Sequence, residues 1–113
     1  MSDMFSSVPV ESTIQTSLVN ASGLTRVLQD INERGYRPKN FLVGKTMYRT
    51  LVTLSGITPP ESVEAGLKGR IFGVRLYVLD EDSNGSFHIH AASKNRDVRF
   101  RVSVVGVEED QSC

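Results

Sequence analysis

The stretch that decides the fold is LKGRIFGVRLYV, residues 67–78. Its second half alternates the apolar residues Val74, Leu76 and Val78 with polar ones, and a period of two is typical of a strand with one buried face. Glycine inside such a run costs conformational entropy, so it indicates a place where the backbone must bend. We therefore predict a strand over residues 74–79 that is entered through a kink at Gly73.

Length and composition predict one compact domain. The chain has 113 residues, of which 39% are hydrophobic and 23% charged, which is typical of globular rather than disordered proteins. Its 13 Lys and Arg balance 13 Asp and Glu, so no global field favours nucleic acid or an anionic membrane. A single cysteine, Cys113, excludes an internal disulfide. Because Asp3 stands where a signal peptide would be basic and no apolar run reaches membrane-spanning length, we expect a soluble, unexported protein without a membrane partner.

Two amphipathic helices are expected in the first half of the chain. In residues 22–34 four apolar side chains fall at helical spacing, namely Leu24, Val27, Leu28 and Ile31. Ser22 is the predicted N-cap, and Gly35 is the residue expected to end this helix. A second helix is predicted over residues 45–55, with Gly56 as its stop.

The last third of the chain is predicted to be β. Three runs with alternating apolar residues, 74–79, 87–91 and 98–104, are separated by two turns. Asn84-Gly85 suits a tight hairpin turn between the first two runs. With a short buried strand at residues 41–43, these runs predict an α+β domain in which two helices pack on an antiparallel sheet of three to four strands.

Two flanking segments are predicted outside the single α+β domain, which is assigned to residues 17–107. Residues 1–16 are rich in Ser, Thr and Val and are expected to form an extended arm or an edge strand. Residues 108–113 begin with Glu-Glu-Asp and form an acidic tail. Segments of this kind become ordered when they bind a neighbouring molecule, through strand pairing or charge complementarity.

Two patterns have some of the ligands of a metal site, but each is incomplete. Residues 80–85, DEDSNG, match the start of a calcium loop, yet the twelfth position, which needs a bidentate carboxylate, is Ala91. His88 and His90 share one face of a predicted strand, but the sequence offers no evident third ligand. We interpret the first pattern as a hairpin turn and the second as structural or exposed histidines, and expect no metal or other cofactor.

Polar residues of the predicted strands gather on one face of the sheet. If the second and third strands pair, this candidate interaction face contains Arg75, Tyr77, His88, His90, Arg99 and Arg101. A basic sheet surface with an aromatic residue is a platform that single-stranded nucleic acid uses. One tyrosine is a poor stacking surface, however, so the polar outer face of a one-sided sheet is the simpler interpretation.

The sequence contains no evident catalytic constellation. Ser22-Gly23 and Ser55-Gly56 lack the second glycine of a nucleophile elbow. Gly44-Lys45-Thr46 copies the end of a phosphate-binding loop, but the first glycine of that loop is missing. We therefore predict no catalytic residues and expect that the protein is not an enzyme.

The order of features from Leu24 to Leu79 resembles part of the axial domain of tailed-phage major capsid proteins, the shell fold shared with encapsulins. The shared features are an amphipathic helix that ends in Gly-Tyr-x-Pro at residues 35–38, a short buried strand, a helix with an aromatic residue and leucines, and a glycine-containing strand at residues 71–76. This resemblance covers about half of the chain. Because 113 residues leave no room for the peripheral domain and extended loop of such shells, it implies a reduced or detached axial-type domain.

Three classes of function remain open to the sequence. The favoured hypothesis is a non-enzymatic phage structural protein, capsid-associated or capsid-derived, which contacts other virion subunits, forms homo-oligomers in the assembly and stays in the host cytoplasm before it. The alternative is a soluble intracellular binding module, such as a phage factor that engages a host protein or nucleic acid through the candidate interaction face. A metal-dependent enzyme that uses the two histidines is the least favoured.

Overall fold

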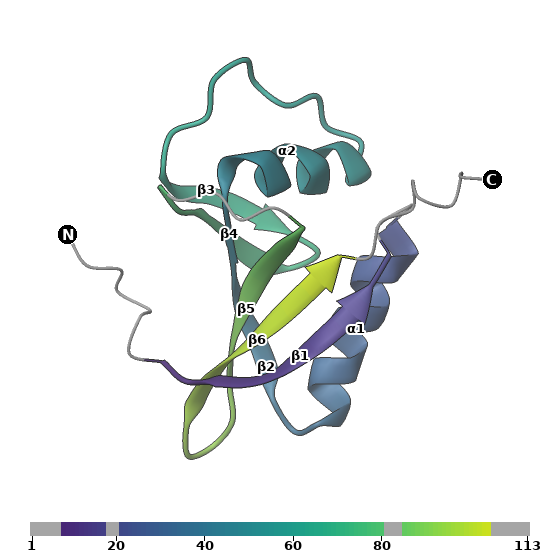
Figure 1. Ribbon diagram of the computed structural model, residues 1–113, viewed down its shortest axis with the longest axis vertical. Coiled ribbons are helices and arrows are strands. Elements are labelled where there is room, and N and C mark those ends of the chain that lie inside the picture. The colour runs from purple at the N-terminus through teal and green to yellow at the C-terminus, as the bar shows by residue number, and fades with distance from the viewer. Residues whose placement is uncertain (1–7, 18–20, 81–84, 105–113) are drawn as a thin grey trace.

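The fold consists of a β-sheet with the helices packed on one of its faces (Figure 1). The computed structural model describes residues 8–17, 21–80 and 85–104. The elements in these ranges are, in chain order, β1 (Val10–Thr16), α1 (Ala21–Glu33), β2 (Arg37–Val43), α2 (Lys45–Leu54), β3 (Gly66–Ile71), β4 (Val74–Val78), β5 (Ser86–Ala92) and β6 (Asp97–Val104). Neither helix in these described ranges is long and apolar enough to cross a bilayer.

The sheet is mixed, with the strand order β1-β6-β5-β2-β4-β3. β2 pairs in parallel with β4 and antiparallel with β5, while β1 pairs in parallel with β6. α1 packs against β1 and β2, and α2 packs against β2 and β4. Both helices lie on the same face of the sheet, since their buried residues belong to one core cluster with the inward residues of the strands.

The hydrophobic core lies between the two helices and the inward face of the sheet. The helices contribute Leu24, Val27 and Ile31 from α1 and Met47, Leu51 and Val52 from α2. The alternating apolar residues of β4, β5 and β6 face them, as the period of two predicts. The expectation of an α+β domain with two helices on a sheet is therefore confirmed.

The prediction of an antiparallel sheet of three to four strands is wrong, because the described residues form a mixed sheet of six strands. β1 comes from the segment predicted as an arm or an edge strand, and its burial pattern shows one buried residue, Ile14. β3 contains Gly66 and Gly69 and is mostly exposed, so it has no apolar alternation to reveal it. Residues 1–7 of the predicted arm and the acidic tail at residues 108–113 lie outside the described residues.

The predicted hairpin between β4 and β5 is also wrong, because β2 lies between these two strands. Asn40 to Val43 are four consecutive buried residues, and a strand that is buried on both faces needs a central position. Residues 81–84, which include the predicted turn residue Asn84, lie outside the described part of the chain. The second predicted hairpin, between β5 and β6, is present as an antiparallel pair.

The glycine in the opening stretch forms a turn rather than a kink. Ile71 pairs with Val74, so Phe72 and Gly73 are the two loop residues of a β3–β4 hairpin. Their φ angles are 51° and 78°, and positive φ at both positions defines the type I′ turn that matches the twist of paired strands. Phe72 is an unusual residue for this conformation, which is strained for bulky side chains.

Replacing Phe72 with asparagine should therefore raise the free energy of unfolding by about 1 kcal/mol, because asparagine adopts positive φ at lower cost. Urea unfolding should show a higher midpoint at an unchanged m value. Phe72→Leu is the matched control, since leucine meets the same backbone strain and should give no gain. Equal midpoints for the two variants would show that strain at this turn does not limit stability.

Glycines end both helices, as predicted. At the end of α1, Gly35 has φ 93°, and the Tyr36 N–H donates to the Ile31 carbonyl at 3.2 Å. The Gly35 N–H donates to the Asn32 carbonyl at 3.0 Å, which completes a Schellman motif. Gly56, with φ 84°, ends α2 in the same way. The predicted N-cap is wrong, because α1 begins at Ala21 and includes Ser22 in its first turn.

Candidate functional site: the helix-free face of the sheet

The strand register brings the candidate interaction residues together on the face of the sheet that the helices leave uncovered. A first row crosses five strands through residues that lie directly opposite one another, in the order Arg70, Arg75, Asn40, His90 and Arg99. We call it the cationic row. The sequence predicted three of its members for this face, namely Arg75, His90 and Arg99. The strand register adds Arg70 and Asn40.

A second row lies two residues further along the strands, in the order Leu67, Tyr77, Leu42, His88 and Arg101. We call it the mixed row, and the two rows together the open face. Adjacent strands are about 4.8 Å apart, so each row spans about 19 Å, and the rows are about 7 Å from each other. All six residues predicted from the sequence belong to the open face.

The open face carries positive charge that the described part of the chain does not neutralise. Arg70, Arg75 and Arg101 are exposed and have no ion pair with a described residue. Arg70 and Arg75 lie directly opposite each other, an arrangement of like charges that destabilises a strand pair. An anionic group placed over this pair would relieve the repulsion.

Arg99 differs from these arginines because its side chain is held by the segment before β1. Its Nε donates to the Val8 carbonyl at 2.8 Å, and its backbone N–H donates to the Pro9 carbonyl at 2.8 Å. Arg99 therefore fixes the start of β1 against β6. It is less available to a partner than Arg75 or Arg101.

His90 is the centre of a polar chain within the cationic row. The Asn40 amide nitrogen lies 2.9 Å from His90 Nδ1, and His90 Nε2 lies 3.3 Å from an Asp97 carboxylate oxygen. A neutral imidazole that carries its proton on Nε2 accepts a hydrogen bond at Nδ1 from the Asn40 amide. Its Nε2–H then faces the Asp97 carboxylate. Asn40 is only 6% exposed, so this contact gives a buried amide a partner. His90 is thus the side-chain partner that the buried Asn40 amide finds on the neighbouring strand.

Within the described residues, the histidine pair gains no further metal ligand from the fold. In the described ranges no group of three His, Cys, Asp or Glu side chains converges, and this includes the surroundings of His88 and His90. Asp82 and Asn84 of the calcium-like pattern and Cys113 lie outside those ranges. Gly44 makes the turn from β2 into α2 as its N-cap residue.

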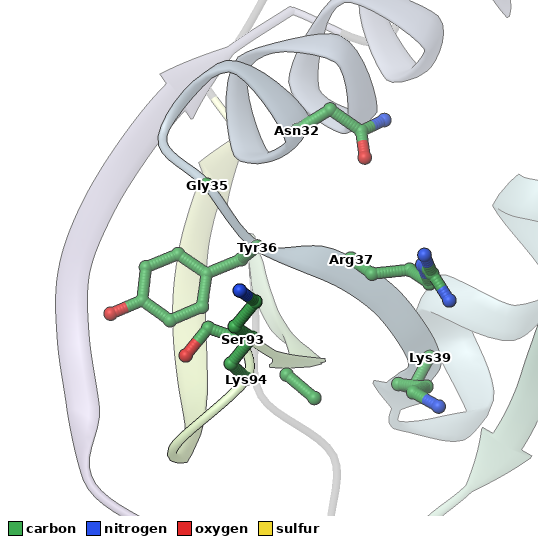
Figure 2. Close-up of a pocket in the computed structure, with 8 residues that line it drawn as sticks. Asn32, Gly35, Tyr36, Arg37, Lys39, Ser93 and Lys94 are labelled. Carbon is green, nitrogen blue, oxygen red and sulfur yellow. The ribbon is translucent and has the colours of Figure 1, made fainter.

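A concave surface lies where the end of α1, the start of β2 and the turn after β5 meet (Figure 2). The cavity measures about 530 Å³. Its lining residues are Asn32, Gly35, Tyr36, Arg37, Lys39, Ala92, Ser93 and Lys94. Sequence reasoning missed this cavity, because its cationic residues come from separate segments that show no common pattern.

Charged residues of the elements around this cavity form ion pairs with each other. Arg34 Nε donates to Asp30 at 2.9 Å, and this side-chain hydrogen bond raises the pKa of the guanidinium above its ordinary value. Arg34 also donates to the Ser12 hydroxyl at 2.8 Å, which links α1 to β1. Arg96 pairs with Glu11 at 2.7 Å. These contacts are exposed and contribute a few tenths of a kcal/mol each.

Comparisons of the chain with protein-family models, with curated proteins and with solved structures find no match. Its function is therefore inferred from its surfaces and from the sequence pattern.

Proposed function

We propose that this chain is a non-enzymatic structural protein of a tailed-phage particle and that it makes protein–protein contacts through the open face. The observation that carries the proposal is the make-up of that face. Its mixed row offers the exposed Leu67 and the half-buried Tyr77 to a partner, while exposed arginines lie around them. Protein interfaces have an apolar core inside a polar rim and are enriched in tyrosine and arginine. The phage setting follows from the resemblance of residues 24–79 to a capsid axial domain.

The edges of the sheet are less suited to such contacts than its face. β3 has an irregular register between Leu67 and Arg70, and β1 has one between Val10 and Ser12. Bulges and charged residues at an edge prevent the addition of a further strand. A partner is therefore expected to lie across the open face rather than extend the sheet.

The small area of the sheet surface that contains the open face predicts that one contact between this protein and a partner is weak. The whole helix-free side of the sheet, with six described strands about 4.8 Å apart and each about 17 Å long, is a plane of about 400 Å², and the open face lies within it. A standard stable interface buries about 800 Å² on each partner. Repeated contacts in an assembly can compensate, because linked weak contacts raise the overall affinity. This size supports a role inside a particle, where many copies act together.

Reversing two charges of the open face should remove the chain from particles. We expect Arg75→Glu/Arg101→Glu to reduce its incorporation into virions of the phage that encodes it by at least about tenfold, because two exposed contact residues would then repel the partner. Quantitative mass spectrometry of purified virions measures the incorporation. Arg26→Glu/Lys45→Glu is the matched control, since these exposed cations lie on the helices. Absence of the wild-type chain from virions would contradict the proposal.

A module that binds an anionic partner such as nucleic acid is the second candidate. The specific observation in its favour is the opposed pair Arg70 and Arg75, which no described carboxylate neutralises. The same double variant separates the candidates through salt dependence. Binding of single-stranded DNA should weaken with salt by a slope of about −0.7 per neutralised phosphate, and Arg75→Glu/Arg101→Glu should flatten that slope. No binding of the wild-type chain to DNA at low salt would remove this candidate.

A further inference from the structure

The cavity between α1, β2 and the turn after β5 gathers three cationic side chains. Arg37 and Lys39 come from β2, and Lys94 comes from the turn. Figure 2 shows Arg37 and Lys39 extending from the same side of β2, with the Asn32 amide across from them on α1. Two segments distant in sequence therefore place their charges around one hollow.

No carboxylate lines this cavity, and its cations have no ion pair with a described residue. Carboxylates of the neighbouring elements have partners elsewhere: Asp30 pairs with Arg34 and Glu11 with Arg96, while an Asp97 carboxylate oxygen lies 3.3 Å from His90 Nε2. Glu33 is exposed on the last turn of α1 but is not a lining residue. In a chain with no net charge, a concave surface with three such cations is suited to an anion.

The backbone around the cavity is fixed before any ligand arrives. The Schellman motif at Gly35 closes the end of α1, so the carbonyls of Ile31 and Asn32 accept hydrogen bonds within the turn. The ring of Tyr36 packs edge-on against Phe100, with centroids 5.5 Å apart and an interplanar angle of 74°. Ser93 N–H donates to the Arg96 carbonyl at 2.9 Å, which holds the turn that carries Lys94. Binding would thus order only the long side chains, which lowers its entropic cost.

We propose that this cavity binds the di- or triphosphate group of a small molecule, a function that goes beyond the particle role. Arginine and lysine are the usual phosphate ligands, and the Asn32 amide adds a neutral donor. One phosphate carries about −1.5 to −2 at pH 7, so a diphosphate, at about −3, balances three cations better. The volume of about 530 Å³ falls in the range of small-molecule sites and exceeds the need of a single phosphate.

Titration of the ¹⁵N-labelled chain with inorganic pyrophosphate at constant ionic strength tests the proposal. The amide signals of Gly35, Ser93 and Lys94 should shift along one saturable curve, with a midpoint below about 1 mM. Orthophosphate should bind more weakly because it matches less of the charge. The triple variant Arg37→Gln/Lys39→Gln/Lys94→Gln should weaken pyrophosphate binding by at least about tenfold, since it removes every charged donor. All three residues are exposed, so the variant should unfold at the wild-type temperature.

Arg26→Gln is the matched control, because it removes an exposed charge from α1 away from the cavity lining. It should bind pyrophosphate like the wild type. Absence of saturation, or the same loss in Arg26→Gln as in the triple variant, would overturn the proposal. A short single-stranded oligonucleotide that shifts these amides while pyrophosphate and nucleoside triphosphates do not would also overturn it, in favour of a nucleic-acid backbone contact. Virion incorporation of the triple variant should be normal, which separates this site from the open face.

Discussion

The Phe100→Ala variant should lose about 3–5 kcal/mol of unfolding free energy, a large share of the roughly 5–15 kcal/mol that stabilises a typical domain. Phe100 has no solvent exposure and lies on β6, one strand from the edge. Its ring contacts the edge of Tyr36, and the Arg34 guanidinium carbon lies 5.6 Å from its centroid. Alanine would leave a cavity between α1 and the sheet and remove both ring contacts at once.

Urea unfolding followed by circular dichroism measures this loss as a lower midpoint at an unchanged m value. Phe72→Ala is the control, since Phe72 is the same residue type but 42% exposed in the β3–β4 turn. It should change the unfolding free energy by no more than about 0.5 kcal/mol. If the two variants lost equal stability, Phe100 would not occupy the helix-covered face of β6 as described.

The elements that the sequence predicted well are those defined by local periodicity. α1 and α2 each show one apolar face and a glycine stop, and both features depend only on neighbouring residues. β4 and β5 alternate buried positions with less buried ones along their whole length, and β6 does so from Asp97 to Val102. The same alternation placed Arg75, His88 and Arg101 on one face, because side-chain direction follows from strand parity alone.

The elements that were missed depend on contacts between distant segments. The parallel pairing of β1 with β6 joins residues 10–16 to residues 99–104, and no local pattern predicts such a partner. The position of β2 between β4 and β5 follows from burial on both faces, but the short run of residues 41–43 did not show which strands would flank it. Strand order depends on contacts across the whole domain. The alternation of apolar residues therefore predicted where strands occur but not which strands lie beside each other in the sheet.

The two candidate sites also differ in how far local sequence patterns predict them. The open face was predictable in part, and the signal that was overlooked is Asn40, a polar residue at the start of a buried apolar run. The cavity was not predictable, because Arg37, Lys39 and Lys94 each belong to a segment that is polar for ordinary reasons. Their convergence depends on the bulge in β2 and on its pairing with β5.

Leu42 gives the most direct test of how the open face is built. It is 2% exposed, yet it does not belong to the core under the helices, and its cross-strand partners are Tyr77 and His88. Side chains of the open face must therefore bury it. Leu42→Ala should lower the unfolding free energy by about 2–3 kcal/mol, toward the low end for a buried leucine because the gap lies near solvent and its neighbours can relax into it.

Leu67→Ala is the matched control for this prediction, since Leu67 lies in the same row on β3 but is 54% exposed. It should change stability by no more than about 0.5 kcal/mol in the same urea experiment. The difference matters for binding as well, because Leu42 separates Tyr77 from His88 and so sets the shape of the mixed row. Leu42→Ala should consequently weaken particle incorporation even at temperatures where the variant stays folded. If both leucines proved equally dispensable, the mixed row would not be a packed surface, and the open face could not act as a preformed contact site.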